Sequence, residues 1–128
     1  MPIKAEDVLR RWMNAVNSGD LEGVLALYSE QAVLIPTFSN RLLNAPEKIR
    51  DYFLKLGSRE DLSIALHEKT LITQLLHDNL VSLCGIYCWR FCVDDELLSF
   101  EARFSYLLDL GAQRPILHHH SSQIPRVL

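Results

Sequence analysis

Three long apolar stretches near the C-terminus constrain the fold most strongly. They cover residues 80–93, 97–109 and 115–124, and short polar segments separate them. The first two alternate along their length and are rich in aromatic and β-branched residues, which is typical of β-strands. Strands joined by short turns pair in antiparallel fashion. The sequence therefore predicts three long neighbouring strands in the last third of the chain.

Side-chain alternation gives each predicted strand two different faces. One face of the first two strands is aromatic and apolar, and it carries Val81, Leu83, Gly85, Tyr87, Trp89, Phe91, Val93, Leu98, Phe100, Ala102, Phe104, Tyr106 and Leu108. The other face is mixed, with Cys84, Ile86, Cys88, Arg90, Cys92, Ser99, Glu101, Arg103, Ser105 and Leu107. A strand face bathed in water is usually uniformly polar. Both faces are therefore expected to be covered, one by helices and the other by a second copy of the chain.

The N-terminal half predicts helices. Residues 4–17 and 21–28 carry apolar side chains at helical spacing, as do residues 44–57. Residues 32–36 and 62–76 are predicted strands, the second with a bulge or bend near 67–70. Helices followed by a run of strands indicate an α+β fold, with three helices packed on one side of a curved, mostly antiparallel sheet.

Local signals set the expected helix ends. The first helix should end at Asn17-Ser18-Gly19, and Asp20 should cap the second. Asn44 is the expected cap of the third helix, because Pro46 and Glu47 follow it as in a capping box.

Length and charge restrict the function classes. The chain has 128 residues and a net charge of −3, so we expect a single domain over 1–128. It has no basic stripe and no long apolar run, so we expect neither nucleic-acid binding nor a membrane span. The N-terminus has no apolar run typical of a signal peptide. Cys84, Cys88 and Cys92 recur on one strand face about 13 Å apart, too far for a disulfide or a shared metal. We expect a cytoplasmic protein with no cofactor.

Several motifs resemble a known superfamily. The segments Trp12–Asp20, Val24–Tyr28 and Ala32–Thr37 resemble the nuclear transport factor 2-like, or SnoaL-like, fold. Glu101-Ala102-Arg103, followed by the His-x-His-x-Ser-x-x-Pro pattern of His118–Pro125, is similar to the association domain of calcium/calmodulin-dependent protein kinase II. The resemblance is closest to the stand-alone bacterial members of that family, and it covers nearly the whole chain.

The resemblance implies a cone, with a cystatin-like arrangement of three helices over a bent sheet and a pocket inside the mouth. It also implies assembly through the sheet as dimers or larger oligomers. The kinase association domain has buried arginines in its pocket, and only Arg103 matches one of them plainly. Cys88 and Ser121 stand where others are expected, with Arg90 two residues after Cys88. No kinase activity is implied.

The candidate site residues follow from the faces and from the resemblance. Arg103 is a candidate bidentate anchor for an acidic ligand, or else a structural partner of Glu101. Glu101 is alternatively a general base whose pKa is raised in an apolar cone. Arg90 and Tyr52 are further candidate ligand contacts, as is Arg41 from the loop at the rim.

The run His118-His119-His120 has two candidate roles. His118 and His120 share a face and are candidate ligand-binding or acid–base groups. Alternation turns His119 the other way, so we expect no metal site from this run.

Three functions remain open on the sequence. The first is a cytoplasmic homo-oligomeric domain that binds a small polar or anionic organic molecule, such as a carboxylate. The second is a cofactor-free enzyme of the SnoaL or ketosteroid-isomerase kind, with Glu101, His118 or His120 as general acid or base. The third is a purely structural assembly domain.

Overall fold

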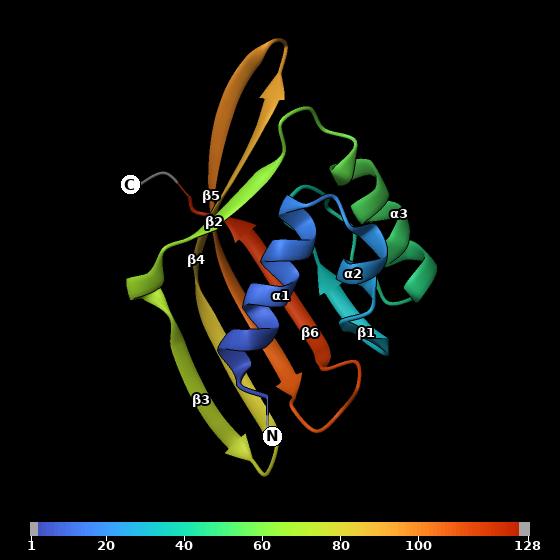
Figure 1. The fold of residues 1–128 in the computed structure, drawn as a ribbon, viewed down its shortest axis with the longest axis vertical. Helices are drawn as coiled ribbons and strands as arrows, with labels where there is room; N and C mark the ends of the chain where they lie inside the picture. Colours follow the sequence, from blue (N-terminus) through green and yellow to red (C-terminus); the bar gives the residue numbers. More distant parts are fainter. Residues whose placement is uncertain (1–2, 126–128) are drawn as a thin grey trace.

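A computed structural model of the chain describes residues 3–125 and shows three α-helices lying on one side of a curved sheet (Figure 1). In chain order the elements are α1 (Ala5–Asn17), α2 (Leu21–Leu25), β1 (Tyr28–Ile35), α3 (Pro46–Gly57), β2 (Ser63–Leu66), the short 3-10 helix η1 (Glu68–Thr70), β3 (Ile72–His77), β4 (Leu80–Val93), β5 (Glu96–Asp109) and β6 (Ile116–Gln123). The predicted α+β order and the three long C-terminal strands are confirmed. None of the described helices is long and apolar enough to cross a membrane.

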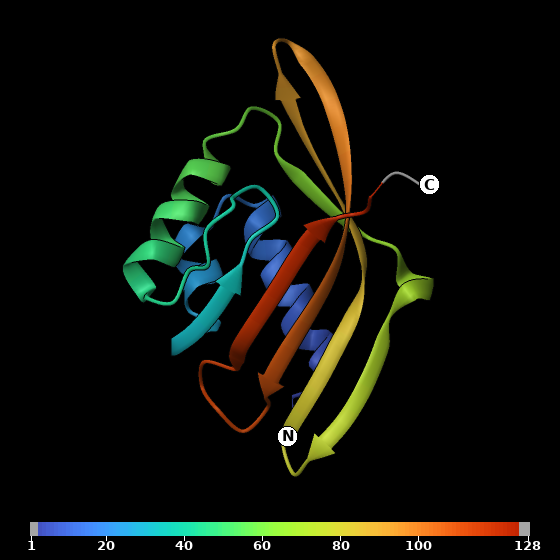
Figure 2. The same cartoon turned by 180° about the vertical axis from the view of Figure 1, so that it is seen from behind.

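The six strands form one mixed sheet in the order β1-β6-β5-β4-β2, and β3 pairs with β4 beside β2. β1 runs parallel to β6, and every other pairing is antiparallel. Figure 2 shows the molecule from behind, with β4, β5 and β6 in front of the helices. The sheet thus has one face under the helices, which we call the inner face, and one open face.

The helix α1 supplies the centre of the core. Its buried stripe is the predicted one, with Val8, Leu9, Trp12, Ala15 and Val16. The Trp12 ring stacks on Tyr87 with centroids 5.7 Å apart and meets Trp89 edge-on at 5.8 Å. The inner face is therefore the aromatic one, because the large rings of β4 and β5 bury most apolar surface where the helices cover them.

The structure confirms the predicted end of the first helix and the predicted cap of the second, but not the predicted cap of the third. α1 ends at Asn17, where Gly19 adopts a φ of +70°, and the Asp20 carboxylate accepts a 2.9 Å hydrogen bond from the Gly23 backbone. The expected Asn44 cap is wrong, since Ala45 occupies the cap position without a side-chain hydrogen bond. Asn44 instead accepts a hydrogen bond from the Lys48 ammonium at 3.4 Å.

Two predicted element limits are corrected by tertiary pairing. The second helix stops at Leu25 rather than at 28, and Tyr28 begins β1, because the Leu27 carbonyl accepts a 2.8 Å hydrogen bond from the Ile116 backbone of β6. The strand expected over 62–76 is two strands separated by η1. The irregularity predicted near 67–70 is therefore a complete break, and the two pieces pair with different halves of β4.

Candidate functional site

A chain of hydrogen bonds runs through the apolar interior of the cone. Its centre is His119 on β6, which is 2% exposed. The Nδ1 atom of His119 lies 2.7 Å from the Tyr28 hydroxyl, and its Nε2 atom lies 3.2 Å from the Tyr87 hydroxyl. The Trp12 indole donates a 3.1 Å hydrogen bond to the Tyr28 oxygen.

The donors and acceptors fix the tautomer of His119. An indole nitrogen can only donate, so the Tyr28 oxygen accepts from Trp12 and the single hydroxyl hydrogen of Tyr28 goes to His119 Nδ1. The remaining ring hydrogen is then on Nε2 and is donated to Tyr87. Burial, with a smaller contribution from His118 and His120, lowers the pKa of His119 to about 3. His119 is therefore a neutral, fixed hydrogen-bonding group.

Small hydroxyl groups continue this chain toward the surface. Ser121 and Thr37 hydrogen-bond to each other, and both hydroxyls lie near enough to Tyr87 to act on its pKa. Burial nevertheless raises the pKa of Tyr87. At the outer end, the Tyr52 hydroxyl accepts a 3.3 Å hydrogen bond from the Phe38 backbone. Burial raises the pKa of Tyr52 to about 12, so its hydroxyl is protonated at neutral pH.

Tyr52 also lines a cavity at the mouth of the cone. The cavity has a volume of about 940 Å³ and lies between the loop after β1, α3 and the end of β4. Aromatic rings line it, from Phe38, Tyr52 and Phe91. Phe38 meets the Phe91 ring edge-on at 5.2 Å and the Trp89 ring at 5.9 Å, so it separates the cavity from the interior.

The rim of this cavity is positively charged although the whole chain is acidic. Four basic side chains line it (Arg41, Lys48, Lys55 and Arg59) against two acidic ones (Asp51 and Glu60), a balance of two positive charges. Across residues 3–125, none of these four cations forms an ion pair. The Arg59 guanidinium lies 5.4 Å from the centre of the Phe91 ring, within cation–π range. The cavity thus combines an aromatic wall with a largely polar rim that carries unpaired positive charge.

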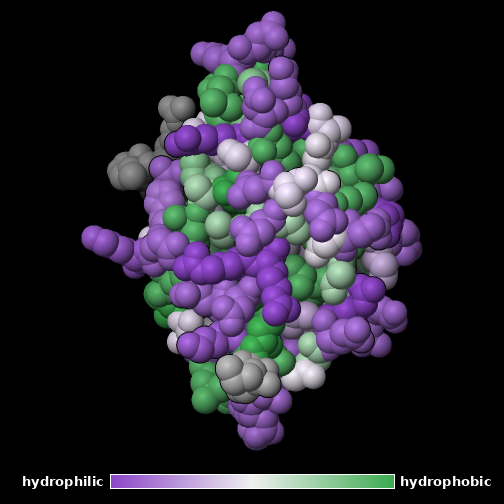
Figure 3. All heavy atoms as spheres, viewed as in Figure 1, coloured by the Kyte–Doolittle hydropathy of each residue, from purple (hydrophilic) through white to green (hydrophobic). Residues whose placement is uncertain are grey.

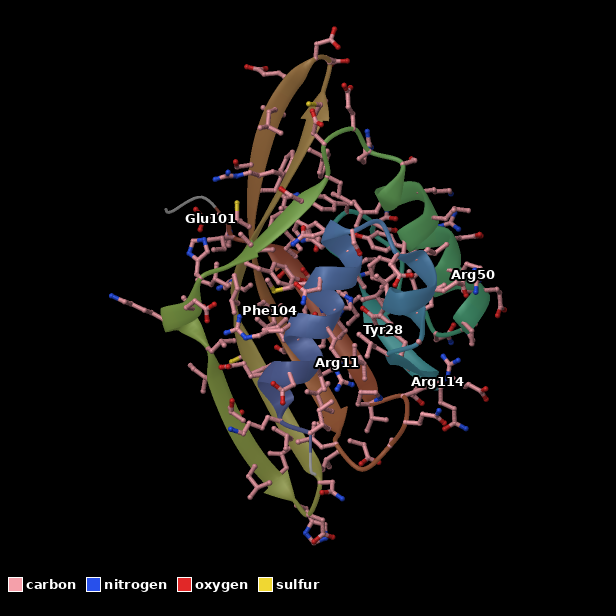
Figure 4. All side chains as sticks on the ribbon, viewed as in Figure 1. Arg11, Tyr28, Arg50, Glu101, Phe104 and Arg114 are labelled. Atoms are coloured by element: carbon pink, nitrogen blue, oxygen red, sulfur yellow. The ribbon has the colours of Figure 1, made fainter. Side chains whose placement is uncertain are left out.

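Most candidates from the sequence lie elsewhere. Tyr52 and Arg41 line the mouth cavity, but Arg90, Glu101, Arg103 and His120 are exposed, and His118 is half-buried. Alternation along β4 and β5 puts the first three on the open face of the sheet. Figure 4 labels Glu101 on the sheet, well away from Tyr28 among the helices. In the single chain these side chains therefore do not line the interior of the cone.

The proposed partner of Arg103 is also absent. No ion pair joins Glu101 and Arg103 within the described part of the chain. Both side chains are exposed to solvent in the single chain, so no apolar surrounding strengthens an electrostatic interaction of either one.

A bulge in β6 explains why His119, rather than His118 or His120, enters the cone. Leu107 pairs with His118 and Leu108 with Ile116, so Leu117 is an extra residue in the strand. Such an insertion moves every following side chain to the other face. Ile116 and His119 are both buried for this reason, whereas strict alternation places them on opposite faces. Sequence reasoning therefore missed His119, and no local turn signal marks the bulge.

Within the described residues, the interior of the cone holds no side chain suited to act as a general base at neutral pH. Apart from buried tyrosines and tryptophans, His119 and Ser121 are the only buried residues of the described chain with polar side chains, so no carboxylate lies there. An effective general base at neutral pH needs a pKa near 7, far above that of His119.

Known structures share this fold. A protein from Xanthomonas campestris named as a calcium/calmodulin dependent protein kinase II association domain superposes with a TM-score of 0.84 at 24% identity, covering 95% of this chain and 86% of that one. A ketosteroid isomerase-like protein from Erwinia carotovora atroseptica gives 0.74 at 12% identity over 94% of both chains. A Novosphingobium aromaticivorans protein named as an aromatic ring hydroxylase gives 0.79 at 12% identity, covering 94% and 87%.

These relatives differ in the functions their names describe, so the likeness identifies the nuclear transport factor 2-like cone and not an activity. No curated protein sequence matches the chain significantly. The family model of the calcium/calmodulin dependent protein kinase II association domain matches residues 4–125. The chain therefore belongs to the calcium/calmodulin dependent protein kinase II association domain family, for which self-association is the implied property.

Proposed function

We propose that the protein is a self-associating domain whose cone mouth binds a small organic anion, such as a carboxylate. The observation that carries the ligand is the mouth cavity, which has aromatic walls and a positive rim in a protein of net charge −3. Apolar walls bind the carbon skeleton of a ligand, and a few charged groups orient its polar end.

Each part of the cavity has a role in this proposal. Arg41 and Arg59 approach from the loop and from the end of α3, and guanidinium groups bind carboxylates through paired hydrogen bonds. Tyr52, protonated at neutral pH, contributes a neutral hydroxyl at the inner wall. The hydrogen-bond chain behind it holds the interior rigid.

The open face is the proposed assembly surface. It carries the other candidates from the sequence, namely Arg90, Glu101, Arg103, His118 and His120. A ligand bound by those residues would lie between two copies rather than inside the cone. The half-buried Ile86 and Leu107 supply apolar surface at the same face.

A thermal-shift panel tests the ligand proposal. Small aliphatic and aromatic carboxylates are compared with their neutral amides, on wild type, Arg41→Gln and Arg59→Gln. We expect carboxylates alone to stabilise the wild type, and each substitution to weaken binding about tenfold, because a charge-assisted hydrogen bond is lost.

Two matched variants serve as controls. Arg11→Gln removes an exposed arginine of α1, which Figure 4 places on the helical side and which does not line the cavity. Arg103→Gln removes the anchor expected from the sequence. Equal carboxylate responses in all five proteins would overturn the cavity proposal, and a loss confined to Arg103→Gln would move the ligand to the open face.

A further inference from the structure

The strand β3 is an edge strand with no protection. All six of its residues, Ile72–His77, are exposed. Ile72 is 59% exposed, Leu75 is 75% exposed and Leu76 is 50% exposed. Hydrophobic surface is visible at the lower left of Figure 3, where Figure 1 shows β3. None of its residues is Asp, Glu, Lys, Arg or Pro.

β3 pairs with β4 on one side only. Within residues 3–125, no backbone hydrogen bond reaches its other edge. The other edge strands are covered, since α1 packs beside β2 and α3 beside β1. Its register shift, between Leu75 and His77, lies at its end beside the turn to β4.

Exposed edges of this kind attract further strands. Natural sheets block them with lysine, proline, a bulge, an inward charge or a covering element. β3 has none of these along most of its length, so its free backbone groups and leucine side chains are suited to pairing with another strand.

We propose that β3 pairs in antiparallel fashion with β3 of a second copy of this chain. Lys69 precedes the strand and Asp78 follows it. Antiparallel pairing about a two-fold axis brings each Lys69 close to the Asp78 of the other copy, whereas parallel pairing does not. A register centred on Gln74 also places Ile72 opposite Leu76 of the other copy.

The ends of β3 are free for these contacts. In the part of the chain that the structure describes, Lys69 forms no ion pair, and the one ion pair of Asp78 is with the neighbouring His77, at 3.2 Å. Charge complementarity therefore selects a second copy over an unrelated extended peptide.

This contact goes beyond the association proposed for the open face. Two short edges bury less than the roughly 1,200 Å² of a standard stable interface, so the β3 contact acts together with another. Two different two-fold contacts on one chain build assemblies larger than a dimer. The β3 edge is thus the contact that joins dimers into larger oligomers.

Edge-blocking substitutions test the proposal. In this register Ile72→Lys places a charge opposite Leu76 of the other copy, and Leu75→Lys places one opposite Thr73, so each substitution puts a lysine on both paired edges. Both sites are too exposed for the change to affect folding. We expect the dissociation constant of the largest assembly, from sedimentation velocity and light scattering, to rise about tenfold. Leu54→Lys on α3 is the matched control, since Leu54 is 57% exposed and lies on a helix.

A charge-relief pair tests the antiparallel orientation. Lys69→Glu should weaken association by setting Glu against Asp78 of the other copy, and adding Asp78→Asn should remove that repulsion and restore part of the association. Asn tolerates the positive φ of 47° at that turn position.

The opposing outcomes are equally specific. A monomeric wild type, or association unchanged by the β3 substitutions, overturns the proposal. A weakened Lys69→Glu variant that Asp78→Asn fails to restore overturns the antiparallel self-pairing and indicates a different occupant. Substitutions on the open face test the interface in the proposed function, whereas substitutions in β3 test the β3 contact. The two proposals can therefore fail separately.

Discussion

His119 is a histidine used for its hydrogen bonds rather than for its charge. It lies between two tyrosine hydroxyls, and the Tyr106 ring stacks on it with centroids 3.9 Å apart. Each ring nitrogen has a partner, so the buried imidazole is satisfied only in its neutral form. Protonation would put a charge into an apolar interior and would turn the acceptor Nδ1 into a donor that faces a hydroxyl hydrogen.

The pKa of His119 predicts a stability loss in acid. The unfolded chain binds a proton at this residue below about pH 6.5, whereas the folded chain does so only below about pH 3. Between these values the unfolded state holds more protons, so the free energy of unfolding falls as the pH falls. His119→Phe should reduce the difference in unfolding free energy between pH 7 and pH 4 by about 3 kcal/mol.

Urea titrations at both pH values measure this difference. His67→Gln, which changes an exposed histidine, is the control and should keep the wild-type pH dependence. The same pH dependence in His119→Phe and in the wild type would show that His119 is protonated in the folded state.

At the scale of elements, the Asn17 side chain of α1 hydrogen-bonds to the backbone of the edge strand β2. The Asn17 amide donates to the Ile64 carbonyl at 3.0 Å and accepts from the Ile64 backbone nitrogen at 2.8 Å. It pairs with β2 as a neighbouring strand would and satisfies backbone groups that the edge leaves free.

Removing this amide should loosen β2. Asn17→Ala is expected to lower the free energy of unfolding by about 2 kcal/mol, because two hydrogen bonds are lost and the backbone of the buried Ile64 is left unpaired. Hydrogen exchange at the Ile64 amide should accelerate. Asn14→Ala, an exposed change on the same helix, should leave both quantities nearly unchanged, and an equal loss there would point to α1 itself.

At the scale of the whole molecule, the two faces of the sheet are unequal. The helices bury the aromatic inner face, whereas the open face carries half-buried apolar residues among exposed polar ones. Ile86 lies in its centre, opposite Arg103 on β5. This face is the one that the proposed association would cover.

A charge at Ile86 should separate the copies. Ile86→Glu places a carboxylate in the proposed contact, where an unpaired charge costs more than the contact gains. Light scattering should give the variant a mass of about half that of the wild type or less. The variant should still be stabilised by carboxylates that bind at the mouth. An unchanged mass would remove the open face from the assembly.

The sequence predicted the fold well because periodicity is a local property. The α1 stripe and the aromatic face of β4 follow directly from helical and strand spacing. The site was predicted less well. Arg103 and Glu101 share a face as expected, but that face lies outside the cone, and the resemblance to the kinase domain had suggested otherwise.

Two features depended on contacts between distant segments. Tyr28 reads as a helical residue in its local sequence, but pairing with β6 makes it the start of β1. The extra residue Leu117 is visible only in the pairing of β5 with β6, and it decides which histidine enters the cone.

The sequence by itself therefore determined which residues are helical or extended and which strand face is aromatic, because neighbouring residues set these patterns. Only the tertiary structure decided that the aromatic face lines the cone, that His119 rather than His118 or His120 enters it, and that basic residues of α3 and the loop after β1 meet at the mouth. Those outcomes depend on strand register and helix docking, which bring together residues far apart in the chain.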